Sequence, residues 1–266
     1  MAESEMEKWD QAAVDYQRVF TLGLNEYNAS LMRFWHEEGM LFPGCRVIDI
    51  GCGVGKYGTY FAELGYDITL TDISGKMLQH ARENMAKFTT PWTVYQCDFN
   101  EATGKEPVFA AGFDLAISTM SPAVHDAATV HKMGAMTRGW CFLARFYDWE
   151  QPFRDTLMRE MGMEPRKVFD DLQGDVDALY AAVKEAGYFP QIRIVPYNWE
   201  DRRTPEQMAD YMFRNFFAGD PEPERLKAET LRIAGELSGA DGCVIDDVKT
   251  SVAWIFWKTE VKEHDS

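Results

Sequence analysis

The chain has 266 residues, with 27 lysines and arginines against 43 aspartates and glutamates, which gives a formal net charge of −16. Hydrophobic residues make up 46% of the chain, enough for a folded core, so the composition excludes an intrinsically disordered protein. The negative charge argues against general binding to nucleic acid or to an anionic membrane surface, because both need clustered lysine and arginine.

The acidic N-terminus has no signal-peptide core, and no stretch approaches the roughly 18 apolar residues of a membrane span. We therefore expect a cytoplasmic protein without a membrane partner. The 5 cysteines are odd in number and widely spaced, so we expect neither a disulfide framework nor a structural metal site. The oligomeric state stays open.

Residues 1–45 are predicted to form an N-terminal helical cap, because apolar residues recur at helical spacing over 5–39 until Gly39. The segment 46–147 is predicted to be a core of alternating strands and helices. Its strands are expected at 46–50, 67–71, 93–97, 113–118 and 139–146, and its helices at 55–64 and 74–87. Such alternation favours βαβ units and a mostly parallel sheet, and therefore an α/β fold.

The segment 148–266 is predicted to add the remaining strands with helical insertions, as part of one integrated domain. Residues 150–172 have no clear period and are interpreted as an insertion. A helix is expected at 175–186, a strand at 191–196, an interrupted helical region at 204–237 and a last strand at 251–258. Helical insertions between late strands often cover the ligand crevice, so we expect a substrate lid here.

The most informative segment is the predicted strand 46–50 and the glycines that follow it, Gly51, Gly53 and Gly55. Glycines there permit a tight turn and close approach of a ligand to the backbone. The helix that begins next supplies free N–H groups suited to an anion. The spacing is GxGxG, and Lys56 occupies the position of the third glycine in the dinucleotide fingerprint.

Two acids close the next two strands. Asp72 follows Asp49 by 23 residues and can accept hydrogen bonds from two ribose hydroxyls. Asp98 can accept from an adenine amino group, while Phe99 and Ile73 offer apolar faces to the ring. All of them lie at the carboxyl ends of strands, where open α/β sheets bind ligands.

In this order, the motifs resemble the class I S-adenosylmethionine-dependent methyltransferases. The resemblance covers about residues 9–147, through 47–55, 71–74, 96–99 and 113–122. It implies a Rossmann-like, seven-stranded sheet whose last strand runs antiparallel, and S-adenosyl-L-methionine as cofactor. The residues expected at that cofactor are Tyr16, Asp49, Gly51, Cys52, Gly53, Asp72, Ile73, Met77, Cys97, Asp98, Phe99, Ser118 and Thr119.

Methyl transfer from a sulfonium is a direct displacement, so the protein must align the acceptor and exclude water, and a general base is optional. His125 and His131, after the fourth strand, are candidate bases because histidine titrates near neutral pH. A second candidate set serves acceptor binding, with aromatic rings for a cationic or planar group and arginines for a carboxylate. It comprises Trp140, Tyr147, Trp149, Tyr197, Trp199, Arg145, Arg154, Arg202 and Arg203.

We interpret the chain as a methyltransferase that acts on a small molecule. The charge disfavours a nucleic-acid acceptor, although a protein or nucleic-acid methyltransferase stays the alternative within the enzymes. A nicotinamide-dependent oxidoreductase is disfavoured by Lys56 in the glycine loop. A catalytically silent sensor or partner subunit that binds the same cofactor would retain the same residues.

Overall fold

The computed structural model describes residues 4–21, 25–110, 112–167 and 169–260. Its elements are α1 (Glu5–Thr21), α2 (Glu26–Glu37), β1 (Arg46–Ile50), α3 (Lys56–Glu63), β2 (Asp67–Asp72), α4 (Gly75–Met85), β3 (Trp92–Gln96), β4 (Phe113–Thr119), α5 (Ala127–Ala135), β5 (Thr137–Glu150), α6 (Pro152–Glu160), α7 (Leu172–Glu185), β6 (Gln191–Pro196), β7 (Trp199–Arg203), α8 (Pro205–Met212), the π-helix η1 (Phe213–Phe217), α9 (Pro223–Glu236) and β8 (Val244–Lys258). The helix predicted over 5–39 is two helices. Residues 22–24 of that prediction lie outside the described residues, as do 1–3 and 261–266 of the predicted end segments.

The chain forms two compact units. Unit 1 takes the described residues of Met1–Phe146, Gln173–Val195 and Ala253–Ser266, and unit 2 consists of the described residues of Tyr147–Leu172 and Pro196–Val252. The three segments predicted from the sequence, 1–45, 46–147 and 148–266, stay a prediction about domains. In the described residues, no helix is long and apolar enough to cross a membrane.

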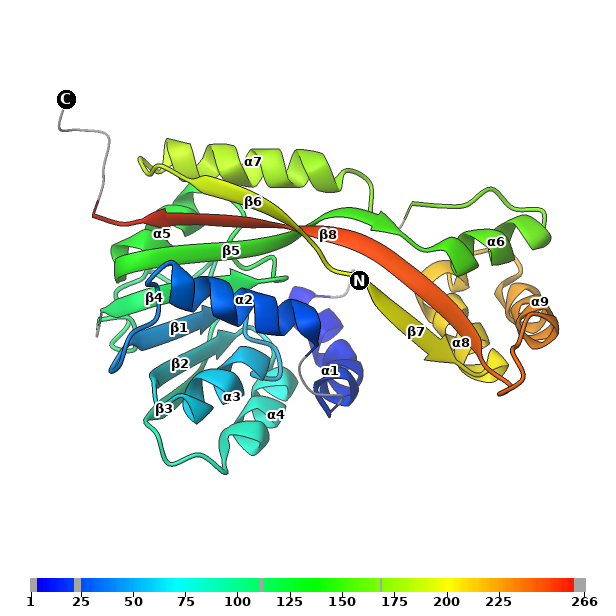
Figure 1. The fold of residues 1–266 in the computed structure, drawn as a ribbon, viewed down its shortest axis with the longest axis horizontal. Helices are drawn as coiled ribbons and strands as arrows, with labels where there is room; N and C mark the ends of the chain where they lie inside the picture. The colour runs from blue at the N-terminus through cyan, green and yellow to red at the C-terminus, as the bar shows by residue number, and fades with distance from the viewer. Residues whose placement is uncertain (1–3, 22–24, 111, 168, 261–266) are drawn as a thin grey trace. The chain divides into compact units, whose positions relative to one another are not determined.

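The sheet has the strand order β3-β2-β1-β4-β5-β8-β6, and β7 pairs with β8 outside this path. Strands β1 to β5 pair in parallel, with Val47 opposite Ile68 on one side and Leu115 on the other. The C-terminal end of β8 runs against β5, since Thr259 N–H donates to the Gly139 carbonyl (3.0 Å), and Figure 1 shows the opposed arrows. The predicted α/β class is confirmed, with β7 added to the seven strands of the main path.

The sheet of unit 1 carries helices on both faces, which explains why its central strands β1 and β4 are buried along almost their whole length. Figure 1 shows α5 and α7 on one face and α2, α3 and α4 on the other. On the α2 face, Phe34 packs against Phe142 of β5 and Trp254 of β8, with ring centroids 6.1 and 4.9 Å apart. On the other face, Tyr188 packs against Trp257, with centroids 6.0 Å apart. Burial on both faces is what parallel strands require.

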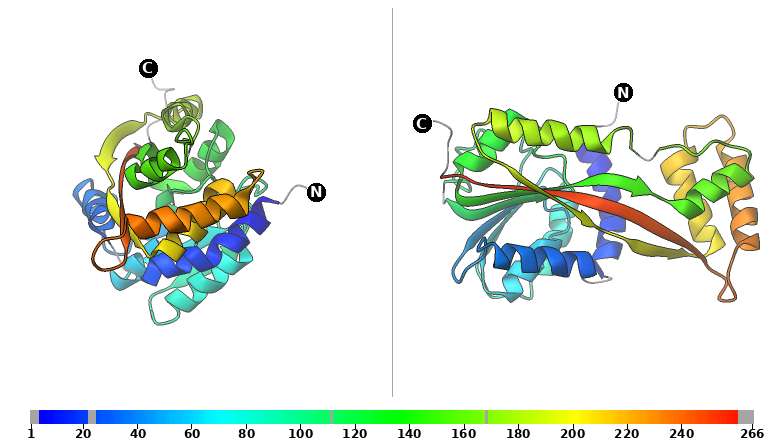
Figure 2. Two further views of the ribbon diagram at one scale, coloured as in Figure 1. Left: turned by 90° about the vertical axis from the view of Figure 1, so that its right-hand side faces the viewer. Right: turned by 45° about the horizontal axis from the view of Figure 1, so that its top comes forward.

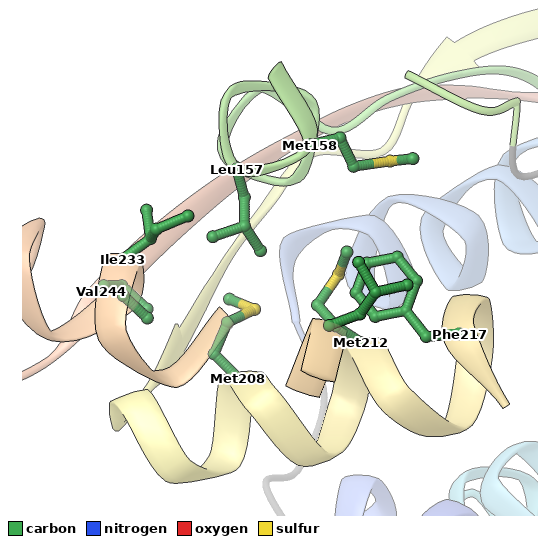
Figure 3. Packing of buried hydrophobic residues seen from close by; sticks show 9 residues of the cluster. Leu157, Met158, Met208, Met212, Phe217, Ile233 and Val244 are labelled. Atoms are coloured by element: carbon green, nitrogen blue, oxygen red, sulfur yellow. The ribbon is translucent and has the colours of Figure 1, made fainter. Parts of the chain in front are cut away.

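Unit 2 has its own apolar core, between α6, α8, α9 and the start of β8 (Figure 3). The antiparallel pair of β7 and β8 supplies its strands, with Trp199 opposite Val248. The core consists of Leu157, Met158, Met208, Met212, Phe217, Leu226, Ile233, Ala234 and Val244. Methionine fills irregular gaps between short helices well, which suits this packing.

Candidate functional site

The glycine loop after β1 has the conformation that its sequence requires. Gly51, Gly53 and Gly55 have φ angles of +74°, +54° and +79°, in the left-handed region that side chains disfavour. The N–H groups of Gly51 and Cys52 both donate to the Thr71 carbonyl, at 2.8 and 2.9 Å. These bonds fasten the loop to the end of β2, and α3 begins directly after Gly55.

The loop after β4 packs on this glycine loop. A Cβ atom on Gly51 would overlap the Ser121 hydroxyl, so glycine is needed there for space as well as for φ. The preceding residue, Met120, has φ +52°, and among the described residues it alone has a positive φ without being glycine. Its N–H donates to the Ala144 carbonyl at 2.9 Å. Strained backbone of this kind is concentrated at functional sites.

Asp72, the last residue of β2, joins two loops of the site. Its Oδ2 accepts from the Gly53 N–H (2.9 Å) and its Oδ1 from the Ser74 N–H (2.8 Å). Burial raises the pKa of this carboxyl, while those N–H donors oppose the rise. A carboxylate oxygen has two lone pairs, so Asp72 can accept further bonds from a ligand.

Asp49, in β1, has a buried carboxyl group without a partner among the described residues. Its side chain is 1% exposed, and neither oxygen accepts a hydrogen bond within the described residues. Burial, followed by the nearby charge of Asp72, raises the pKa of Asp49 to about 8. A buried polar group that lacks a partner is costly, and a ligand that brings a cationic donor would relieve that cost.

Helix α1 covers the glycine loop. Tyr16 Cδ1 and Met77 Sδ each lie 3.9 Å from the position of a Cβ on Gly53. Asp10 of α1 accepts from the Ser74 hydroxyl (2.5 Å) and the Lys76 N–H (3.1 Å) at the start of α4. Figure 2 shows α1 beside α4. The space above Gly53 is therefore bounded by Tyr16 and Met77, which the sequence also predicted at the cofactor.

The end of β3 carries the remaining predicted acid. Asp98 is partly buried, and its Oδ1 accepts from the Asn100 N–H at 2.9 Å. Phe99 is only 3% exposed, with its ring edge-on to that of Phe109. Ile73 stays partly exposed. Ile73 thus offers an accessible apolar surface, whereas Phe99 lies beneath the surface of the site.

The two predicted cysteines lie in surroundings that disfavour the thiolate form. Burial raises the pKa of Cys97 to about 11, and it also raises the pKa of Cys52, which the charges of Asp49 and Asp72 increase further. A thiol must ionise to act as a nucleophile or as a metal ligand. No group of three or more potential metal ligands occurs in the parts of the chain that the structure describes.

The end of β4 brings Ser118 and Thr119 to the same edge of the sheet. Ser118 is fully buried, and its hydroxyl has no partner among the described residues. His125 is 54% exposed in its side chain, with Nδ1 3.1 Å from the Pro122 carbonyl oxygen. His131 lies on the exposed face of α5. Among the residues that the structure describes, no hydrogen bond or ion pair joins His125 or His131 to the glycine loop.

Three of the predicted aromatic residues come together in unit 2. The ring centroids of Trp149 and Trp199 are 5.2 Å apart at 74°, and those of Tyr197 and Trp199 are 4.9 Å apart. Trp140 instead packs against Phe256 in unit 1. At these spacings the unit 2 rings pack directly on one another.

Comparison with known proteins connects this geometry to a chemistry. Residues 47–138 match a family model described as a methyltransferase domain. The chain is 34% identical over 83 residues to the ribosomal RNA small subunit methyltransferase C of Alcanivorax borkumensis, which covers 31% of this chain and 25% of that protein. It is 51% identical over 41 residues to a malonyl-acyl-carrier-protein O-methyltransferase of Erwinia pyrifoliae, which covers 15% of this chain and 16% of that protein. The matches thus span a quarter or less of these curated relatives.

A solved structure extends the likeness to the whole fold. It is phosphoethanolamine N-methyltransferase 2 of Haemonchus contortus, in complex with phosphomonomethylethanolamine and S-adenosylhomocysteine. The match covers 97% of this chain and 60% of that chain, with a TM-score of 0.54 and 15% identity. At this identity the likeness is one of fold.

Proposed function

We propose that this chain is a class I S-adenosylmethionine-dependent methyltransferase that methylates a small-molecule acceptor by direct displacement, and the match of residues 47–138 to a methyltransferase domain supports this proposal. The observation that carries this proposal is the Asp49 carboxylate, which is buried with both oxygens unpartnered at the foot of the left-handed glycine loop. The cofactor's methionine end carries an ammonium group, and this cationic donor would stabilise the ionised form of Asp49 over the protonated form that burial favours.

The residues of the site fit the cofactor. Asp49 and the glycine loop would hold its methionine end, with Tyr16 and Met77 above Gly53. Asp72 would accept from the ribose hydroxyls. Asp98 and Ile73 would contact the adenine, and Phe99 would pack beneath the adenine site. The other predicted residues would line the cofactor site: Gly51, Cys52, Cys97, Ser118 and Thr119.

When bound, the cofactor supplies an activated methyl group on a sulfonium. The chain's own residues then have to align the acceptor and exclude water. The loop that begins at Met120 is suited to this task, because its strained backbone packs on the glycine loop through Ser121. His125 and His131 remain candidate bases for an acceptor that carries a proton.

The charge of the chain supports a small acceptor. A net charge of −16 repels a polyanion, and binding of nucleic acid relies on neutralising several phosphates with lysine or arginine. A small acceptor needs only a few well-placed polar groups in an otherwise apolar site.

Methyl-labelled cofactor tests the proposal. The purified chain is incubated with the label and with three fractions of one cell extract: small molecules, proteins and RNA. We expect label in the small-molecule fraction, and its loss in Asp72→Ala. A matched control is Asp67→Ala, which removes an acid from the other end of β2 that pairs with Arg46. Label in the protein or RNA fraction, or cofactor binding without transfer to any fraction, would contradict the proposal.

A further inference from the structure

One arginine differs from the others that the sequence pointed to as carboxylate ligands. Arg154 pairs with Asp155 (2.6 Å), Arg203 pairs with Asp201 (2.6 Å), and Arg202 pairs with Asp241. Each of these guanidinium groups therefore has its anion within unit 2. Arg145, in β5 of unit 1, forms no ion pair with any residue that the structure describes.

The partners of Arg145 are three backbone carbonyls. Nη1 donates to the oxygens of Ser118 (3.1 Å) and Ala144 (2.8 Å), and Nη2 donates to that of Val124 (2.7 Å). These carbonyls lie at the carboxyl end of β4 (Ser118), at the residue of β5 that pairs with the last residue of β4 (Ala144), and in the loop after β4 (Val124). The guanidinium is thus fixed beside the segment that begins with Met120 and packs on the glycine loop.

Not all N–H donors of Arg145 have an acceptor among the described residues. A guanidinium has five N–H donors, and three of them are used by the carbonyls. The Nε–H and one Nη2–H have no acceptor in the described ranges, although the side chain is partly exposed. Two donors on one planar group match the two oxygens of a carboxylate.

The charge is not compensated either. Burial lowers the pKa of Arg145 to about 10, and no carboxylate opposes that effect. Carbonyl dipoles orient the guanidinium, but they do not neutralise it. A partly buried cation without a counter-ion is costly in a protein, and an anionic ligand removes that cost.

We propose that Arg145 binds the carboxylate of the methyl acceptor, so that the acceptor is a small organic acid. This inference rests on the proposed function and assigns the substrate class of the same site. Fixed by Ser118, Ala144 and Val124, the guanidinium holds the acid group beside the carboxyl end of β4.

A direct test measures binding of acetate to the full chain saturated with S-adenosylhomocysteine. The melting temperature is recorded from 0 to about 50 mM acetate, with acetamide as the neutral counterpart at equal ionic strength. We expect acetate to raise the melting temperature of the wild type, and acetamide to leave it unchanged. Arg145→Gln should lose the response to acetate, and Arg145→Lys should retain part of it.

The matched control is Arg138→Gln. Arg138 lies in the same strand, but its guanidinium already donates to Asp114 (2.6 Å), so this variant should respond to acetate like the wild type. An equal response in Arg145→Gln, or no response in the wild type with the cofactor product bound, would overturn the inference. If the cofactor product itself does not bind, it is the proposed function that fails.

Turnover provides a second readout. Labelled cofactor is offered with a pool of amino and hydroxy acids and with a pool of the matching primary amides. We expect methyl transfer to the acids alone, and Arg145→Gln to raise KM for the methylated acid about tenfold or more. Transfer to the amides at equal efficiency would contradict a carboxylate-binding role, while leaving the methyltransferase proposal intact.

Discussion

At the scale of single residues, the site depends on two acids with different partners. Asp72 has N–H donors on both oxygens, whereas Asp49 has no partner for either oxygen among the described residues. Both carboxyls have raised pKa values, and burial is the main cause. The buried carboxyl group of Asp49 therefore destabilises the fold, and a ligand that brings a donor to it would relieve that cost.

The raised pKa of Asp49 predicts a pH-dependent stability. The folded chain keeps a proton on Asp49 up to about pH 8, whereas the unfolded chain loses it near 3.8. Between these values the free energy of unfolding falls as pH rises, by up to about 1.4 kcal/mol per pH unit from this group. Asp49→Asn removes that fall. Urea unfolding at pH 5, 6, 7 and 8 should show an advantage of the variant that grows with pH, and a constant difference would contradict the account.

Gly51 and Gly53 form a matched pair for a second prediction. Alanine at either position strains a left-handed backbone by about 1–2 kcal/mol. At Gly51 it also collides with Ser121, so Gly51→Ala should cost more stability than Gly53→Ala. Denaturant midpoints measure both losses. Adding Ser121→Gly to Gly51→Ala removes the collision, so it should recover the extra stability that Gly51→Ala loses relative to Gly53→Ala. Equal losses in the two single variants would show that Ser121 does not make the close contact.

At the scale of elements, α1 is held on the core by polar contacts that join distant parts of the sequence. Asp10 bonds to the start of α4, and Gln17 exchanges two amide hydrogen bonds with Asn84, at 3.0 and 2.9 Å. Asn84 also donates to the Val54 carbonyl in the glycine loop (2.9 Å). These bonds position Tyr16 over Gly53, so we expect the helix to form part of the proposed cofactor site.

Asp10→Ala should loosen this helix. Loss of its bonds to Ser74 and Lys76 costs about 1 kcal/mol, so cofactor affinity should fall about fivefold. Hydrogen exchange of α1 amides should accelerate at the same time. Glu5→Ala is the control, because its exposed partner Lys8 lies within the same helix. If both variants bind the cofactor like the wild type, α1 does not contribute to the site.

Elements defined by local signals were predictable. The bounds of β1, Arg46–Ile50, are those predicted, because an apolar strand bounded by glycines can be recognised without knowledge of its contacts with distant residues. By contrast, β8 begins at Val244 rather than 251, since Asp246 is buried within it and breaks the apolar pattern. The sequence of β7, WEDRR, shows no alternation of apolar and polar residues, so it does not predict a strand. The segment is a strand because it pairs with β8.

The same limit applies to the site. The glycine loop and Asp72 could be predicted from the sequence because they lie within one βαβ unit. The contact of Asp10 with Ser74 joins residues 64 positions apart, and Met120, whose φ is positive, donates its N–H to the distant Ala144 carbonyl. Sequence patterns do not encode such contacts individually. The division of the N-terminal helical stretch also depends on a local signal, the Asn25 capping box, which the apolar periodicity does not reveal.

At the scale of the whole molecule, the chain has two units with separate cores. Leu157 is fully buried in the core of unit 2, whereas Leu231 on α9 is 40% exposed. Leu157→Ala should cost about 2–5 kcal/mol through the cavity that it leaves. Hydrogen exchange should then accelerate in unit 2 and not in β1 or β4, and Leu231→Ala should change little. Equal acceleration in both units would contradict separate cores.

The central claim is that the glycine loop, Asp49 and Asp72 form a site for S-adenosylmethionine. Calorimetric titration of the purified chain with S-adenosylmethionine, S-adenosylhomocysteine and NAD tests it most directly. We expect micromolar binding of the first two, no binding of NAD, and an affinity weakened in Asp72→Ala by about 1–3 kcal/mol. Binding of NAD alone, or an unchanged affinity in Asp72→Ala, would contradict it.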